Sequence, residues 1–580
     1  MQREIIGIDF GTTNSAVAFI EFDEPVIIEN DENESVTPSI VYFKEGGDVV
    51  VGNVAKQNII ANPELTIKSI KRHMGTDHRI QIGDASYPPE YIGAQIIKKL
   101  VQNAEERIGA SFTDAVITVP AYFMDPQRQA VKDAAEIAGL NVKAIINEPT
   151  AAALAFGFGE DTDQRVLVYD FGGGTFDVSI LNIGGGFFDV DATSGDNHLG
   201  GDDIDAKIEE FIIDKIKENH NIDLRKQKQK NLSLIQSIRE EAERAKIELS
   251  VKTQVIINLP FIGTTNRGRQ ISFSYNFSRQ EFNKLISDFI LRTKKPIENA
   301  LDGAALDIED IDEIIMVGGT TYIPAVREFV REFFGKEPKQ NINAMELVAL
   351  GAAAATLKDT VKEVAGNIHK PMEVSDVTSH SLGVLIANGT VSRIISKNTK
   401  IPIVQTEPYT NSWDYTESVE IEVYQGESLM PEEEGFLGNF SIDVEPMPAY
   451  ESKIDVTFEV GEEFGILNVT AKDQDSGNER KVKMEAIGRL SKKEKNRWMK
   501  KLLNMQAIEV NIVNVESKDV LKYYLNPNAY ISNIKNELMQ KKILAEGFGI
   551  FYNDVELDEN IQIKNIGIKE NSTLEIMQKK

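Results

Sequence analysis

Short apolar runs alternate with amphipathic stretches over residues 1–366, at the spacing typical of an α/β protein. One helix is clearly marked: Asp125 is predicted to cap it, Pro126 suits its first position, and Gly139 is predicted to end it. The charged stretch from Leu232 to Leu249 predicts a second long helix.

The pattern changes after this region. Mixed polar sequence over 367–376 predicts a linker, and short runs of Val, Ile, Phe and Tyr between turn residues predict an all-β sandwich over 377–488. A basic helical piece follows at 489–506. Residues 507–580 order strands around one helix, which suits a β-grasp module with its own core. The chain is therefore predicted to be multidomain.

Two Asp-Phe-Gly turns carry the clearest chemistry. DFGTTN at 9–14 and DFGGGTFD at 170–177 each follow a short apolar run and precede another. Glycines let backbone N–H groups approach an anion, threonine hydroxyls add donors, and a strand-end Asp can hold a hydrated divalent cation. Two such turns facing each other would clamp a nucleoside triphosphate. A third turn, Gly318-Gly319, suits close approach by a sugar or adenine ring, and the P-loop pattern is absent from the sequence.

Phosphoryl transfer to water needs charge neutralisation, alignment and a positioned water more than covalent chemistry. Asp9 and Asp170 are candidates for a hydrated Mg²⁺, and Thr12, Thr13 and Thr175 for the phosphate oxygens. Lys71 is a candidate point charge near the γ-phosphate, and Glu148 could orient the water. Composition alone does not single out these last two, because a lone Lys or Glu is usually a solvated surface charge.

Composition narrows the setting. The 580 residues include no Cys, which excludes disulfides and thiolate chemistry and suits the cytoplasm. The first residues do not form a signal-sequence pattern, and no apolar stretch is long enough to span a bilayer. A net charge of −28 argues against binding to nucleic acid or an anionic membrane surface.

A series of long motifs runs in order along the first domain: IGIDFGTTNS, IKRHMG, VITVPAYF, IINEPTAAALAFG, VYDFGGGTFDVS, HLGGDDID, AERAKIELS and VGGTTYIPAV. Together they resemble the nucleotide-binding domain of the DnaK-type molecular chaperones, the seventy-kilodalton heat-shock family, within the actin/hexokinase fold. The resemblance continues through DVTSHSLG, VYQGE, LGNF, VTFEV and GILNVTAKD to about Ile487. It implies an ATPase whose nucleotide state controls the affinity of the β-sandwich for unfolded or apolar peptide segments.

The resemblance also assigns roles to individual residues. It implies ATP and Mg²⁺ as cofactors, with K⁺ as a further candidate, and catalytic roles for Lys71, Glu148, Thr175 and Asp170. The implied nucleotide-binding residues are Asp9, Gly11, Thr12, Thr13, Gly172, Gly173, Gly174, Asp177, Gly200, Gly201, Glu243, Lys246, Ser250, Gly318, Gly319 and Tyr322. Pro120, Arg128 and Asp376 match positions that carry the signal between domains.

A peptide groove in the sandwich would combine exposed backbone edges with an apolar pocket. By motif alignment the pocket residues are Val384, Ile386, Tyr409, Val419 and Ile421. The arch over a bound peptide falls on Ala387 and Ser412, both small, so the enclosure is expected to be loose. Without the resemblance, these residues would be interpreted as ordinary sandwich core.

Several positions depart from the family pattern. The linker ends in the polar sequence Met372-Glu373-Val374-Ser375, which is expected to weaken or rewire coupling. Ala144 stands where the family uses an Arg to receive J-domain cochaperones, so that partner is in doubt, whereas a nucleotide exchange factor is expected. Tyr322 replaces an Arg beside the adenine, where its ring could stack. His380 is interpreted as a surface residue rather than a pH switch.

The end of the chain departs most from the family pattern. Only residues 491–506 resemble the start of the family's helical lid, and the following sequence, ISNIKNELMQK and IFYNDVELDENIQIKNIGIKENSTLEIM, resembles ubiquitin. Val515, Phe551 and Met577 fall where ubiquitin presents its apolar patch, although they could equally be half-buried strand residues. The sequence ends without Gly-Gly, so the module is expected to dock on a receptor rather than be conjugated.

Two other classes of function remain open. The first is an ATP-sensing adaptor with weak coupling between its domains, favoured by Ala144 and the polar linker. The second is a small-molecule kinase on the same fold, disfavoured by the β-sandwich and the tail.

Overall fold

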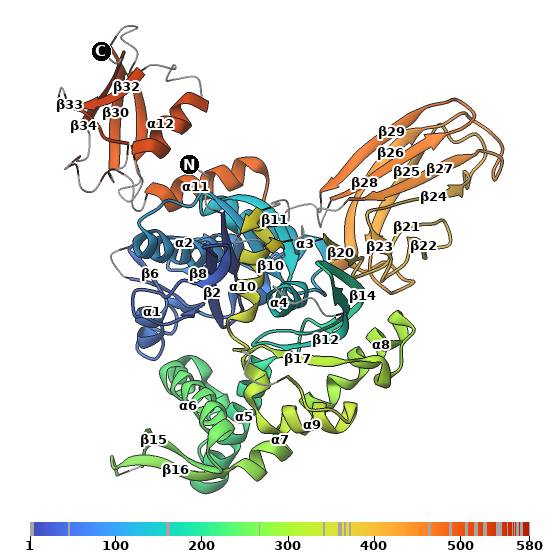
Figure 1. Ribbon diagram of the computed structural model, residues 1–580. Helices are drawn as coiled ribbons and strands as arrows, with labels where there is room; N and C mark the ends of the chain where they lie inside the picture. The colour runs from blue at the N-terminus through green and yellow to red at the C-terminus, as the bar shows by residue number, and fades with distance from the viewer. Residues whose placement is uncertain are drawn as a thin grey trace.

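The computed structural model describes most of the chain. The described residues are 5–44, 47–157, 163–265, 267–339, 343–357, 362–364, 367–369, 373–461, 466–485, 490–504, 508–515, 520–525, 531–540, 548–553, 555–559, 561, 563, 566, 568 and 572–578. They form an α/β domain of two lobes, a β-sandwich and a small C-terminal sheet (Figure 1). Within these residues no helix is long and apolar enough to cross a membrane.

The first lobe is built on a sheet of order β11-β10-β1-β2-β3, with β4 beside β2. Its strands are β1 Ile5–Asp9, β2 Asn14–Glu21, β3 Glu24–Ile27, β4 Thr37–Pro38, β10 Asp114–Val119 and β11 Asn141–Asn147. Strand β1 pairs parallel with β10 and antiparallel with β2, so the first Asp-Phe-Gly turn is the connection between β1 and β2. Smaller strands lie beside this sheet: β5 Val41–Phe43, β6 Val49–Val51, β7 Thr66–Ile67, β8 Ile80–Ile82 and β9 Ala85–Tyr87.

The helices of this lobe are α1 Asn53–Asn58, η1 Ile70–His73, α2 Pro89–Ile108 and α3 Asp125–Ile137. Helix α4 Glu148–Gly157 follows β11 and packs on the sheet of the second lobe, chiefly on its strands Gln164–Phe171 and Phe176–Gly184. The predicted cap on α3 is wrong: Asp125 lies inside the helix, Met124 is the capping position, and the Met124 N–H donates to Gln127 Oε1 (2.9 Å). The helix ends before Gly139, as predicted.

The second lobe repeats the arrangement. Its sheet has the order β17-β12-β13-β14-β20-β23, and the turn between β12 and β13 is the second Asp-Phe-Gly turn. The strands are β12 Gln164–Phe171, β13 Phe176–Gly184, β14 Phe187–Asp196, β17 Glu313–Val317, β20 Glu373–Val377 and β23 Lys400–Ile401. A separate hairpin pairs β15 Gln254–Thr264 with β16 Gln270–Ser278.

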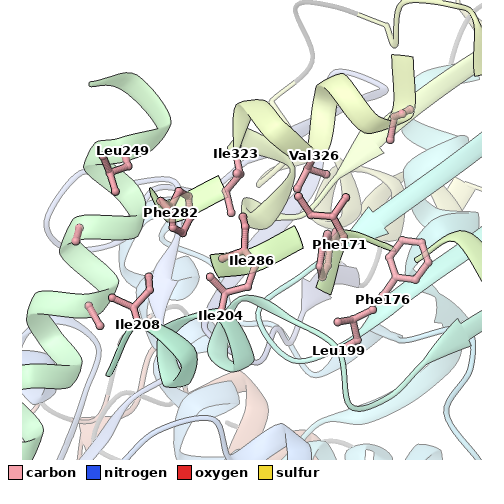
Figure 2. Close-up of a cluster of buried hydrophobic side chains, with 14 of the residues drawn as sticks. Phe171, Phe176, Leu199, Ile204, Ile208, Leu249, Phe282, Ile286, Ile323 and Val326 are labelled. Carbon is pink, nitrogen blue, oxygen red and sulfur yellow. The ribbon is translucent and has the colours of Figure 1, made fainter. Parts of the chain in front are cut away.

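The helices of the second lobe are α5 Gly201–His220, η2 Leu224–Asn231, α6 Leu232–Val251, α7 Arg279–Arg292, α8 Lys294–Ala304, η3 Ile308–Asp310, η4 Gly319–Tyr322 and α9 Pro324–Phe334. Helix α10 Leu347–Ala354, followed by η5 Ala355–Leu357, returns to the first lobe, where it packs on β1, β2 and β3. The predicted helix over 232–249 is confirmed as α6. The core joins α5, α6, α7 and α9 to the underside of the Asp-Phe-Gly turn, where Phe171 and Phe176 are fully buried (Figure 2). This packing fixes the turn, since both flanking aromatic residues are held in the core.

The sandwich has two antiparallel sheets, β22-β21-β25-β26 and β24-β27-β28-β29. Their strands are β21 Leu382–Leu385, β22 Val391–Ile395, β24 Ile403–Tyr409, β25 Ser418–Gln425, β26 Phe436–Asp443, β27 Ile454–Val460, β28 Ile466–Asp473 and β29 Glu479–Glu485; the short η6 Glu433–Gly435 precedes β26. Between the two domains, β18 Lys362–Val364 pairs with β19 Asn367–His369.

The final elements are one helix and one sheet. Helix α11 Lys492–Asn504 packs on α3 and α2 of the first lobe. The sheet has the order β31-β30-β34-β32-β33 and its central pair, β30 and β34, is parallel. Its elements are β30 Ile508–Asn514, β31 Val520–Leu525, α12 Ile531–Gln540, β32 Phe548–Tyr552, β33 Val555–Glu556 and β34 Ser572–Gln578. It encloses a core of its own around residues such as Ile512, Leu538 and Leu574.

Candidate functional site

A cleft of about 800 Å³ lies between the two lobes. Both Asp-Phe-Gly turns reach it and face each other closely: a Cβ added to Gly173 would overlap the Thr13 hydroxyl, and one added to Gly174 would meet Thr12. Glycine is therefore required on one turn so that the other can approach. At the third turn Gly318 has φ 84° and lies against the Phe171 carbonyl, so a side chain there would be both strained and obstructed.

Most of the predicted nucleotide residues line this cleft. They are Asp9, Gly11, Thr12, Thr13, Lys71, Glu148, Asp170, Gly172, Gly173, Thr175, Gly201, Glu243, Lys246, Ser250, Gly318, Gly319 and Tyr322. Gly174, Asp177 and Gly200 are not part of the lining. Asp177 is completely buried, and a Cβ on Gly200 would collide with Gly173, so these residues lie behind the surface that a ligand would touch.

Lys71 and Glu148 meet at the floor of the cleft. Lys71 comes from η1 and is 2% exposed; its ammonium donates to the carboxylate of Glu148, the first residue of α4. The ring centroids of Phe10 and Phe123 lie 5.8 and 5.9 Å from the Lys71 ammonium. The ammonium is held in place by the aromatic rings and one carboxylate. It can therefore interact with an incoming anion with little rearrangement of the surrounding side chains. Nothing in the sequence pattern identified the two aromatic residues.

Three buried carboxylates surround this pair. Burial, and next the charge of Glu148, raise the pKa of Asp177 to about 7, and the same two causes raise the pKa of Asp9 and of Asp170. The Thr118 hydroxyl donates to Asp9 (3.2 Å) and the Tyr122 N–H donates to Asp177 (2.8 Å). In the part of the chain that the structure describes, no three acidic or His side chains are arranged to ligate a metal directly. The donor set thus suits a hydrated cation held through water and phosphate oxygens, whose charge would relieve the repulsion.

The far end of the cleft is formed by α6 and η4. Lys246 forms an ion pair with Asp205 (2.7 Å) and donates to the Gly201 carbonyl (3.1 Å), while Lys56 of the first lobe reaches Glu243 (2.8 Å). The ion pair between Lys56 and Glu243 crosses the cleft. It was not predicted, because the two residues are distant in sequence.

The Tyr322 ring is 41% exposed beside this end of the cleft. Its hydroxyl donates to Asn343 Oδ1 (3.2 Å), and the Arg327 guanidinium lies 6.0 Å from the ring centroid. A flat ring and a guanidinium are therefore both available where the family pattern has a single Arg.

A buried chain of polar contacts connects the first lobe to the strand that leads into the sandwich. Arg128, 2% exposed, donates to the carbonyl of Ala121 and to Asn147 Oδ1 (both 2.8 Å). Asn147 in turn donates to Asp376 Oδ2 (3.1 Å), which also accepts from the Thr150 hydroxyl (3.1 Å). Pro120, buried at the end of β10, accepts from the Phe123 N–H (3.2 Å) beside this chain.

The predicted linker is partly a strand. Residues 373–375 pair parallel with 187–189 of β14, and the Glu373 N–H donates to the Gly186 carbonyl (3.0 Å). The next residues pair with β23, which lies between β22 and β24 of the sandwich in sequence, so the second-lobe sheet takes in a strand from the sandwich segment of the chain. Because these contacts use the backbone, a polar side chain such as Glu373 does not prevent them.

Other contacts join the sandwich to the α/β domain. Lys400 forms an ion pair with Asp189 (2.6 Å), Asn398 accepts from the Thr193 N–H (3.1 Å), and Gln425 accepts from the Asp125 N–H (2.9 Å). None of these was predicted.

His380 lies inside this interface. It is 2% exposed, the centroid of its ring lies 4.3 Å from that of Tyr122 with the two ring planes tilted by 40°, and burial lowers its pKa to about 3. The interpretation of His380 as a surface residue is therefore wrong, because the ring is covered by a domain that the local sequence could not reveal. Ala144, in contrast, is exposed on β11.

The residues predicted for the peptide pocket lie at one end of the sandwich. Val384 and Ile421 are buried in its core, whereas Ile386, Tyr409 and Val419 are half-buried at its margin. The Tyr409 hydroxyl contacts Ser392 (3.1 Å). Among the predicted arch residues Ala387 is exposed and Ser412 half-buried, so both arch positions are accessible.

The cleft between the two lobes, with its opposed glycine turns, defines a nucleotide-binding protein. A β-sandwich is attached to this nucleotide-binding unit through the strand that leaves the second lobe. The sequence model of the family described as Hsp70 protein matches residues 5–546. The chain is also 46% identical over 500 residues, 85% of its length and 82% of theirs, to the chaperone protein DnaK of Thermotoga neapolitana and of Thermotoga petrophila. The chain therefore belongs to the Hsp70 family, and it is an ATP-dependent chaperone that binds unfolded polypeptides.

Proposed function

We propose that the cleft residues divide the work of ATP hydrolysis. Asp9 and Asp170 hold a hydrated Mg²⁺, and Thr12, Thr13 and Thr175 bind phosphate oxygens. Lys71 stabilises charge at the γ-phosphate, and Glu148 orients the attacking water. The ion, when bound, supplies further charge neutralisation, with K⁺ as a second candidate. The buried Lys71–Glu148 ion pair between two opposed phosphate-binding turns carries this proposal.

The remaining cleft residues bind the nucleoside and the phosphate backbone. Glu243, Lys246, Ser250 and Tyr322 would contact the nucleoside, and Gly318 and Gly319 would allow its close approach. Gly174, Asp177 and Gly200 support the lining from behind.

The peptide site belongs to the sandwich. Val384, Ile386, Tyr409, Val419 and Ile421 would form the pocket for an apolar side chain, with Ala387 and Ser412 above it. Nucleotide state reaches this pocket through the chain of contacts from Arg128 to Asp376 and through strand β20, which is supported by its pairing with both domains.

The test is the dissociation rate of a fluorescent apolar peptide from the full chain, first in ADP and then in ATP. Clearly faster release in ATP is expected, because binding energy at the cleft would favour a different arrangement of the sandwich. Equal rates in the two nucleotides would contradict the coupled cycle.

A second candidate function, an ATP-sensing adaptor, is favoured by one observation. The residue exposed on β11 where the family receives J-domain cochaperones is Ala144, which offers no charge or hydrogen bond. The adaptor would bind ATP but show no nucleotide-dependent change in peptide release. A nucleotide exchange factor remains an expected partner of either function, and the absence of Cys favours the cytoplasm.

The C-terminal sheet is proposed to be a ubiquitin-like β-grasp module that docks on a receptor. Its strand order, with a parallel central pair, supports this fold. The register places Phe551 and Met577 on one face: Phe551 opposes Glu575, two residues from Met577, and the alternate residue Ile576 is buried. Val515, the residue after β30, is 44% exposed. These three side chains form the proposed recognition patch.

A further inference from the structure

We propose that Trp413, Tyr415 and Tyr450 form a second contact surface for the client polypeptide, next to the pocket. The inference rests on the proposed peptide site and deepens it by naming residues that would hold the client beyond that pocket. The three side chains are 76, 67 and 74% exposed. Aromatic surface that is exposed to water on adjoining loops is unfavourable in the free protein. A bound apolar segment would remove this surface from water and would thereby gain binding free energy.

The two loops that carry these residues are fixed to each other. Asn411 is 1% exposed and its side-chain amide donates to the carbonyls of Met447 (2.9 Å) and Pro448 (3.1 Å). The Tyr415 N–H donates to the Met447 carbonyl (2.7 Å), and the Tyr450 N–H donates to the Asn411 carbonyl (2.9 Å). The three rings therefore project from a braced support rather than from two independent loops, which lowers the entropy lost when they bind.

Two of the three residues have unfavourable backbone conformations. Tyr415 has φ 53° and Tyr450 has φ 67°, the left-handed region that Gly and Asn adopt more easily than a bulky residue. Neither ring is packed into the core, so the packing of the sandwich does not account for an aromatic residue at these positions. A role in binding would account for aromatic residues at these two positions, since strained backbone is commonly found where a side chain is presented to a ligand.

The register places this surface beside the proposed pocket. Strand β25 begins at Ser418, and its first residues pair with the last residues of β26. The hairpin between β21 and β22 turns at the same end, because Val384 pairs with Val423 and the strands run antiparallel. The loops 386–390, 410–417 and 444–453 thus share one end of the sandwich, and Trp413 directly follows Ser412 of the proposed arch.

The occupant is an extended client segment whose apolar side chains continue past the pocket. An extended chain presents a side chain to the same face about every 7 Å, so one segment can reach both the pocket and the neighbouring rings. Helix α11, which follows the sandwich in sequence, packs on the α/β domain and leaves these rings exposed. Where the arch residues are small, the aromatic surface would supply contact that the arch does not.

The fluorescence of Trp413 tests the inference in the unaltered chain. The sequence contains two tryptophans, and the other, Trp498, is only 8% exposed. The probe is a short peptide with a central run of Leu and Phe. At saturation the Trp413 emission should shift to shorter wavelength, and its quenching by acrylamide should fall about twofold. The same titration of Trp413→Phe identifies the signal as that of Trp413.

Affinity is measured in parallel. The triple variant Trp413→Ser, Tyr415→Ser, Tyr450→Ser should bind the peptide about tenfold more weakly. The control is Val404→Ser, which removes a 62% exposed apolar side chain at the other end of β24 and should leave the affinity within about twofold. An unchanged thermal unfolding transition of the sandwich in both variants shows that this domain is folded.

The outcomes separate the two proposals. Peptide binding with an unmoved Trp413 signal and unchanged affinity in the triple variant would overturn the second surface and leave the pocket standing. Peptide that does not bind even the unaltered chain would overturn the proposed peptide site itself. A Trp413 shift that appears on raising protein concentration without peptide would show that a second copy of the chain occupies the surface, and would also overturn the inference.

Discussion

The Trp498 indole of α11 packs against the Tyr91 ring of α2, with ring centroids 5.0 Å apart. Tyr87 lies beside the same indole, the Lys501 ammonium is 4.3 Å from the Tyr87 centroid, and Leu502 is completely buried. Lys495 adds ion pairs with Asp133 (2.9 Å) and Glu136 (2.8 Å) of α3. The helix that resembles the start of a lid thus extends the core of the first lobe.

Replacing Trp498 with Ala should therefore destabilise the first lobe. Loss of a large buried aromatic side chain costs about 3 kcal/mol of unfolding free energy, limited by how readily α11 detaches. Denaturant unfolding, combined with limited proteolysis of α11, measures the effect. The exposed tryptophan supplies the control: Trp413→Ala should change the unfolding free energy by less than about 0.5 kcal/mol. Equal effects of the two substitutions would mean that α11 does not remain docked.

Lys71→Ala should abolish hydrolysis while leaving ATP binding intact. The ammonium sits beside Glu148 in the cleft, whereas the residues proposed to bind the nucleoside lie on α6 and η4. Loss of a preorganised charge at the transferred phosphoryl group is expected to slow the single-turnover rate at least about 100-fold. Lys44→Ala, at an exposed position, is the control. An unchanged single-turnover rate in Lys71→Ala would remove this residue from the catalytic set.

Acid should weaken docking of the sandwich through His380. In the docked structure burial holds the pKa of His380 at about 3, below its ordinary value of 6.5, so the docked state binds this proton less tightly. Docking is therefore unaffected above pH 6.5 and becomes less favourable as the pH falls toward 3. At pH 5 the effect is about 2 kcal/mol if undocking restores the ordinary pKa.

His380→Gln should remove this dependence, whereas His198→Gln, at an exposed position, should not. Because the chain has no native Cys, one cysteine introduced into each domain can carry dyes that report docking by energy transfer. Asp376 opposes the histidine: burial raises its pKa to about 6, so its protonation favours docking as the pH falls from about 6 to 4. Parallel pH profiles of His380→Gln and the unaltered chain would contradict the role of His380.

The strand pairing of the linker can be tested at one donor. The Glu373 N–H donates to the Gly186 carbonyl, so Glu373→Pro removes this hydrogen bond while Glu373→Ala keeps it. The proline variant should lose about 1 kcal/mol of docking energy or more, and its peptide release should respond about fivefold less to ATP. Similar behaviour of the two variants would mean that the backbone contact does not transmit the nucleotide signal.

Removal of residues 508–580 should leave ATPase activity and peptide binding within about twofold of the full chain. The C-terminal sheet has a core of its own, to which the other domains contribute no residue in the described part of the chain. Steady-state hydrolysis and peptide affinity check this expectation. Loss of either activity would show that the C-terminal unit supports the rest of the structure.

Local sequence was sufficient to predict a structural feature wherever one short segment forms that feature by itself. The two Asp-Phe-Gly turns, helix α6 and the alternation of strands and helices could all be predicted, because glycine, threonine hydroxyls and apolar periodicity act within a few residues. The cap of α3 was predicted wrongly, since Gln127 satisfies the terminal N–H in place of Asp125. Lys71 and Glu148 could be named only through the resemblance of the motifs around them.

The sequence by itself determined the family, the order of the domains and most residues of the nucleotide cleft, since long motifs carry their geometry within them. Only the tertiary structure decided where α11 lies, that His380 is buried against Tyr122, and that a polar linker still pairs as a strand with β14. The physical reason is that these contacts join surfaces contributed by segments that lie far apart in the sequence, residues 187–189 and 373–375 being the nearest pair. Their energy depends on the shape and backbone donors of both surfaces, which neither segment encodes alone.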